Sequence, residues 1–84
     1  MSIEERQKFR AVLLKDLYEK YFEGTCLSIV GYKNTKTTEL EKILAYEFMR
    51  DLGLLTIKFA EFGKAEVEIS AAGIKAVEQG IEKI

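Results

Sequence analysis

Several residue types on which enzymes and metalloproteins depend are missing or rare in this 84-residue chain. Histidine is absent, which excludes Ser-His and Cys-His catalytic pairs and histidine metal ligands. Cys26 is the single cysteine, so neither an internal disulfide nor a cysteine zinc site can form, and we expect Cys26 to be a small buried side chain. The chain also has no proline, no glycine-rich phosphate loop and no nucleophile motif. These absences predict a protein that is not an enzyme and that holds no metal or cofactor.

A charge excess and a long apolar run are missing as well. Thirteen basic residues face fourteen acidic ones, so any contact with nucleic acid must come from a local patch rather than from an overall positive field. No secretory or membrane-spanning segment is recognisable, which predicts a cytoplasmic protein without membrane contact. The length and the hydrophobic content of 48% predict one folded domain over residues 1–84. A domain of this size buries only about 60% of its unfolded surface, so a monomer would be marginally stable.

The first half of the chain begins with a predicted helix over residues 2–22. Ser2 and Glu5 have the spacing of a capping box, and Gly24 supplies a stop. An apolar stripe with a spacing of four runs along this helix, formed by Phe9, Leu13, Leu17 and Tyr21. Residues 25–34 fit either a short helix capped by Thr25 or a short strand around residues 27–30; the helices on both sides favour the helix.

A second long helix is predicted over residues 38–52, where Thr38 and Glu41 have the spacing of another capping box. Gly53 is suited to the left-handed conformation that ends a helix, and Leu54 to the apolar contact of such a cap. Large apolar residues surround most of this helix, so we expect it to lie centrally, packed against several elements; they are Leu40, Ile43, Leu44, Tyr46, Phe48, Met49 and Leu52.

After Gly53 the apolar spacing changes from helical to alternating. Residues 55–60 and 66–70 alternate apolar and polar side chains, and the short turn 62–64 contains a glycine, so the two segments predict a β-hairpin. Leu55, Ile57 and Phe59 share one face of the first strand. Ser70 then caps a final helix whose apolar seam is Ile74, Val77, Ile81 and Ile84.

Two stretches in this order resemble the winged helix-turn-helix family. "AYEFMRDLGLL" (residues 45–55) is similar to the family's usual end of its third helix, and "VEISAAGIKAVE" (residues 67–78) to its exit from the wing, with Ser70 where Thr is usual and Gly73 where Gly is usual. The resemblance covers most of residues 38–80. It implies an α+β, mostly α fold with three helices, a two-stranded hairpin wing and a C-terminal helix. It also implies DNA binding, with the third helix in the major groove and the wing on the backbone.

The resemblance implies a DNA-contact set in this chain and a role as a small transcriptional regulator. The set comprises Lys33, Thr35, Lys36, Thr37, Thr38 and Lys42 around the start of the helix, and Lys58 and Lys64 on the wing. Against this function, residues 37–52 carry four carboxylates and only two basic groups, and no arginine lies near the helix start. The alternative is therefore an adaptor that binds proteins without DNA affinity, through the acidic helix and an exposed Phe62 or Tyr32. Packing of these two aromatics in the core or against the wing is slightly favoured over their exposure.

The two terminal helices offer more apolar surface than one small core requires. We therefore expect a homodimer in which they pair, with an interface formed by Phe9, Leu13, Leu17, Ile74, Val77 and Ile81. The alternative is that both stripes close the core of the monomer.

Overall fold

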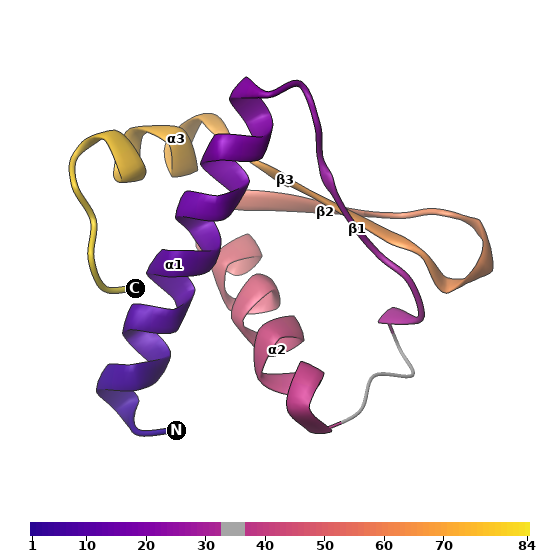
Figure 1. Ribbon diagram of the computed structural model, residues 1–84, viewed down its shortest axis with the longest axis horizontal. Coiled ribbons are helices and arrows are strands. Elements are labelled where there is room, and N and C mark those ends of the chain that lie inside the picture. The colour runs from indigo at the N-terminus through magenta and orange to yellow at the C-terminus, as the bar shows by residue number, and fades with distance from the viewer. Residues whose placement is uncertain (33–36) are drawn as a thin grey trace.

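The computed structural model describes residues 1–32 and 37–84, with the side chains at 37, 38 and 62 left aside. This part of the chain is α+β and mostly helical, with three α-helices and one antiparallel sheet of three strands (Figure 1). The elements are α1 (Ile3–Phe22), β1 (Leu27–Ile29), α2 (Thr37–Asp51), β2 (Leu55–Phe59), the 3₁₀ turn η2 (Glu61–Gly63), β3 (Ala65–Ile69) and α3 (Ala71–Glu78).

Helix α1 begins and ends as its sequence predicts. The Ser2 hydroxyl accepts a hydrogen bond from the Glu5 amide at 3.2 Å, and the Glu5 carboxylate accepts one from the Ser2 amide at 3.1 Å. These bonds also hold the pKa of Glu5 below its ordinary value. At the other end Gly24 is left-handed (φ +77°), and the Thr25 amide reaches back to the Lys20 carbonyl at 2.9 Å. The capping box and the glycine stop are both confirmed.

The prediction of a short helix in residues 25–34 is wrong where the structure describes them. Residues 27–29 form strand β1, which pairs antiparallel with β3 so that Leu27 faces Val67 and Ile29 faces Ala65. Leu27 and Ile29 are half-buried while Ser28 is exposed, which is the alternation of a strand. The order in the sheet is β1-β3-β2, so the sheet has a third strand beyond the predicted hairpin. A pairing partner distant in sequence decided between two conformations that the local residues both allow.

Helix α2 starts one residue earlier than predicted, at Thr37, and ends one residue earlier, at Asp51. The predicted Thr38–Glu41 capping box depends on the Thr38 side chain, which lies outside the described part, and the carboxylate of Glu41 binds Arg6 of α1. At the far end Gly53 has φ +79°, and the Leu54 amide donates to the Met49 carbonyl at 2.9 Å. Leu54 itself is half-buried and packs against the core, so the predicted cap is confirmed.

The hairpin of β2 and β3 is confirmed with its turn. Leu55 pairs with Ile69 and Phe59 with Ala65, and the Ala60 amide donates to the Lys64 carbonyl at 2.8 Å to close the turn. The alternation on β3 is complete, because Ala65, Val67 and Ile69 are buried. On β2 it weakens towards the tip, and Phe59 is 59% exposed. Its ring packs edge-on against the Tyr32 ring, with 5.4 Å between ring centroids.

The core lies between α1, α2 and one face of the sheet. Its largest fully buried side chains come from all three of these parts: Tyr46, Leu14, Leu17, Met49, Leu55 and Val67. Helix α3 is shorter than its apolar seam predicts. It ends at Glu78, Gly80 is left-handed (φ +81°), and Ile81 and Ile84 belong to a tail that returns to α1, where the Ile84 amide donates to the Gln7 carbonyl at 3.0 Å.

The start of α3 is packed closely against the turn that follows α2. The Ser70 amide donates to the Leu54 carbonyl at 3.0 Å, and the Ser70 hydroxyl donates to the Gly53 carbonyl at 2.5 Å. The same hydroxyl caps α3 by accepting from the Gly73 amide at 3.2 Å, as predicted. A Cβ atom on Gly73 would overlap the Leu54 carbonyl oxygen and come within 2.6 Å of Ile69 Cγ1. Only glycine fits this contact.

We expect Gly73→Ala to lower the free energy of unfolding by about 1–3 kcal/mol, the usual cost of overpacking a close contact. Helix propensity alone predicts that the same change raises the free energy of unfolding by about 1 kcal/mol, so the sign of the measured change distinguishes the two effects. Urea denaturation measures this change in the free energy of unfolding. Ala72→Ser, at the exposed neighbouring position, is the control and should change stability by less than about 0.5 kcal/mol. A Gly73→Ala protein as stable as the wild type would contradict the packing of α3 on this turn.

Candidate functional site

The predicted DNA-contact residues divide into those that the structure describes and those that it does not. Lys33, Thr35 and Lys36 lie outside the described residues, and Thr37 and Thr38 form the start of α2, their side chains left aside. Lys42 is half-exposed on α2, Lys58 is exposed on β2, and Lys64 is exposed beyond η2. In the described part of the chain, none of these three lysines takes part in an ion pair.

A small buried cluster brings the start of α2 and the end of the hairpin together. It contains Ile43, the neighbour of Lys42, and Ala65, the neighbour of Lys64, with Tyr32 as its third member. In Figure 1 the start of α2 and the hairpin tip lie on the same side of the molecule, away from α3. Lys42 also lines a groove of about 220 Å³ beside strand β1. The start of α2 and the hairpin, the elements that carry the three described lysines, therefore meet at this edge of the fold.

Acidic groups lie close to this edge. Glu66 stands directly opposite Lys58 in the hairpin register, and it is exposed. Glu39, in the first turn of α2, lines the same groove as Lys42. The turn η2 adds exposed Glu61 close to Lys64. Three carboxylates thus accompany the three described lysines at this edge.

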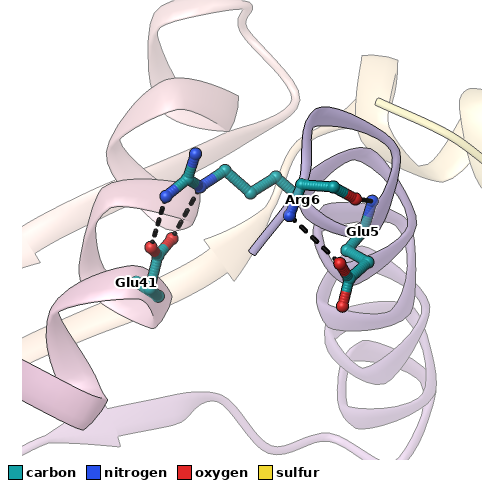
Figure 2. A network of polar contacts seen from close by, with 4 residues as sticks. Glu5, Arg6 and Glu41 are labelled. Atoms are coloured by element: carbon teal, nitrogen blue, oxygen red, sulfur yellow. Dashed lines mark hydrogen bonds and ion pairs between the residues drawn. The ribbon is translucent and has the colours of Figure 1, made fainter.

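The other carboxylates of α2 are accompanied by arginines. Arg6 of α1 forms a two-pronged contact with Glu41, with Nη2 2.8 Å from Oε1 and Nε 3.2 Å from Oε2 (Figure 2). Arg50 Nη2 lies 3.8 Å from a Glu47 carboxylate oxygen and 3.3 Å from one of Asp51. Arg6 therefore adds one positive charge beside α2 that the count within the helix leaves out, whereas Glu47 and Asp51 share Arg50, so the sequence objection to DNA binding is reduced only in part.

The Arg6–Glu41 contact joins α1 to α2 across 35 residues of sequence. The hydrogen bonds from Arg6 and its positive charge hold the pKa of Glu41 below its ordinary value of 4.5, and the same hydrogen bond raises the pKa of Arg6. The sequence did not predict this contact, because no local pattern links positions so far apart.

The outer face of α2 is apolar. Leu40, Leu44 and Phe48 recur every fourth residue and are 44%, 51% and 41% exposed, and Leu52 is 54% exposed. The core face of the same helix is formed by Ile43, Ala45, Tyr46 and Met49, all buried. The prediction that α2 packs against several elements is confirmed for one face, which contacts α1 and β2, while its second apolar face is exposed in the described part of the chain.

A groove of about 310 Å³ runs between α1 and this outer face. Its lining is apolar at the centre and charged at the rim: Arg6, Phe9, Arg10, Glu41, Leu44, Ala45 and Phe48. The Arg10 guanidinium lies 4.0 Å from the centroid of the Phe48 ring, a cation–π contact, and Arg10 Nη1 donates to the Ile84 carbonyl at 3.4 Å. The i, i+4 spacing of Leu40 and Leu44 can be recognised in the sequence, but this spacing does not predict which face of α2 the other elements cover.

Most residues of the predicted dimer interface pack inside the monomer. Leu13 and Leu17 are 8% and 2% exposed and belong to the core, so they cannot line an interface. Phe9, Ile74 and Val77 are half-buried against that core, and Ile81 lies beyond the end of α3. These apolar stripes therefore serve mainly to close the core of the monomer. This is the alternative to a dimer interface that the sequence analysis left open.

Tyr32 is buried, as the favoured interpretation predicts, and burial raises the pKa of its hydroxyl, so it does not offer the contact surface that an adaptor would need; the side chain of Phe62 is outside the described part. The expectation that Cys26 is buried is wrong. Cys26 is exposed, because it lies between α1 and β1 and outside the core.

Among residues 1–32 and 37–84, no group of three or more side chains is arranged to hold a metal ion. No described helix combines the length and the apolar character needed to cross a membrane. Comparisons with protein-family models, with curated proteins and with solved structures give no match to this chain.

The lowered pKa of Glu41 gives a pH-dependent prediction. Because this pKa is lower in the folded than in the unfolded state, the Arg6 contact stabilises the fold above pH 4.5 and loses its effect as the pH falls through the folded pKa. We expect Arg6→Gln to return the Glu41 pKa towards its ordinary value in an NMR titration. The variant should be less stable than the wild type near neutral pH, with the difference vanishing in acid.

Lys8→Gln is the matched control, because Lys8 pairs only with exposed Glu4 on its own helix at 3.6 Å in the described part of the chain. This substitution should leave the Glu41 titration unchanged. A Glu41 pKa that does not respond to Arg6→Gln would contradict the contact.

Proposed function

We propose that this chain is a winged-helix domain that binds double-stranded DNA and acts as a small transcriptional regulator. The order α1-β1-α2-β2-β3-α3, with a helix directly before a hairpin, supports the winged-helix assignment. So does the position of β3 between β1 and β2. In a helix-turn-helix a second helix would precede α2, but only residues 30–36 separate β1 from α2, so the proposal is based on the order of the described helices and strands.

The observation that supports the proposal is the contact between Ile43 and Ala65 in one buried cluster, because Lys42 and Lys64 are the sequence neighbours of these two residues. Lys58, further along the hairpin, belongs to the same strand pair. Ammonium groups without intramolecular carboxylate partners are available to phosphate oxygens, and neutralising phosphates releases counterions and favours binding. The arginine partners of Glu41, Glu47 and Asp51 reduce the repulsion that a bare acidic helix would exert on DNA.

The apolar outer face of α2 limits how this helix would be used. Leucine and phenylalanine side chains do not hydrogen-bond to base edges, so the central part of α2 is poorly suited to lie along a major groove. We therefore assign the DNA contacts to the start of α2 and to the hairpin. The same apolar face favours a second candidate function, protein binding through α2.

Binding to a fluorescent random-sequence duplex, measured by anisotropy as salt rises from about 20 mM, tests the DNA proposal. We expect affinity to fall steeply with salt. The Lys58→Glu, Lys64→Glu double variant should bind about tenfold more weakly for each phosphate that it no longer neutralises at about 0.1 M salt, and its salt slope should be shallower.

Lys15→Glu, Lys75→Glu is the matched control, because it makes the same change in charge at two exposed lysines on α1 and α3. It should retain most of the affinity. No binding at low salt, or equal reductions in both double variants, would contradict DNA contact at this edge and favour the protein-binding function.

A further inference from the structure

The outer face of α2 carries a continuous apolar ridge, which we call the α2 ridge and define as Leu40, Leu44, Phe48 and Leu52. The side chains are between 41% and 54% exposed, although the Arg10 guanidinium of α1 lies over part of the Phe48 ring. A helix face this apolar, opposite a face that is already in the core, is typical of a surface that a partner covers.

The two flanks of the ridge carry opposite net charge. On the flank next to α1, Arg6 and Arg10 accompany the single carboxylate of Glu41, and all three line the groove. Because an α-helix turns by about 100° per residue, Glu41 and Glu47, three residues before and after Leu44, project on opposite sides of it. Glu47 and its neighbour Asp51 share one arginine, Arg50, so this second flank has a net negative charge.

We propose that the occupant of this face is a second copy of the chain, with α2 packed against α2 around a two-fold axis that runs along the helices. Such an axis turns each arginine flank towards the acidic flank of the partner. A two-fold axis perpendicular to the helices would instead place arginine flank against arginine flank. The charges therefore select the arrangement in which both α2 helices run in the same general direction.

The shape of the face fits the same arrangement. Residues four apart form one ridge of an α-helix, and ridges of this kind pack into the neighbouring grooves of a partner helix at a crossing angle of about −50°. Here each ridge has a groove beside it, between α1 and α2 and lined by Phe9, Ala45 and Phe48. A ridge and its adjacent groove on the same surface are what a self-complementary interface requires.

This inference does not depend on DNA binding, because the α2 ridge lies apart from the lysines assigned to DNA. Its test is the mass of the full chain in solution, by sedimentation equilibrium or light scattering, from micromolar to millimolar protein. We expect the wild type to approach twice the 9.6 kDa chain mass. Leu44→Glu should weaken self-association at least about thirtyfold, as expected for a residue at the centre of an interface.

Val12→Glu is the matched control, since Val12 is 61% exposed and lies on the charged face of α1, between Lys8 and Asp16 in the helical repeat. It should associate as the wild type does, with circular dichroism verifying that both variants fold. A wild type that remains a single chain at millimolar concentration, or equal weakening in both variants, would overturn the proposal.

Charge exchange tests the direction of the helices. Arg10→Glu or Glu47→Arg alone should weaken the dimer, and the two together should restore it, because they exchange partners across the two-fold axis. A double variant weaker than either single variant would overturn this arrangement. With Cys26→Ser to remove the exposed native thiol, Leu44→Cys should also cross-link on oxidation while Val12→Cys should not.

A single-chain mass with salt-dependent DNA binding would overturn only the dimer. A dimer that does not bind DNA would contradict only the function proposed above.

Discussion

The arrangement of the hairpin depends on the contact between α3 and the turn that follows α2. Gly73 lies so close to the Leu54 carbonyl that no side chain fits, and Ser70 binds the carbonyls of both Gly53 and Leu54. These contacts fasten the residue before β2 to the residue after β3, so Leu55 must pair with Ile69. The register in turn sends Val67 and Ile69 into the core and sets how far the hairpin extends towards the start of α2.

Sequence patterns predicted the features that depend on nearby residues. The capping box of α1, the glycine stop of α2 and the change to alternating spacing after Gly53 each involve residues within a few positions of one another, and all are found. Strand β1 was missed because its partner β3 lies almost forty residues away, and nothing local separates a short strand from a short helix there. The end of α3 was misplaced because Ile81 and Ile84 keep a helical spacing beyond Gly80, the residue that ends the helix.

The candidate site shows the same division between local and distant information. Lysines on a predicted helix and hairpin were identifiable, but the salt bridge between Arg6 and Glu41 joins two helices whose packing no spacing rule predicts. The ridge residues Leu40, Leu44 and Phe48 were recognised as apolar and assigned to contacts within one chain. Periodicity reports that a helix has two apolar faces, and only the packing of the other elements decides which face is left for a partner.

The two apolar faces of α2 also decide how DNA binding and self-association fit together. A surface cannot be buried against a second copy and inserted into a polar groove at once, and the ridge is unsuited to the groove in any case. The lysines proposed to contact DNA are not part of the ridge. They lie on the second turn of α2 and on the hairpin, the two elements that meet in the cluster of Ile43 and Ala65. The Arg6–Glu41 contact joins α1 to α2 at the rim of the groove next to the ridge and involves none of those lysines. The two proposals therefore use separate surfaces of one helix, its outer face for a second copy and its beginning for a phosphate backbone, while a third surface packs in the core.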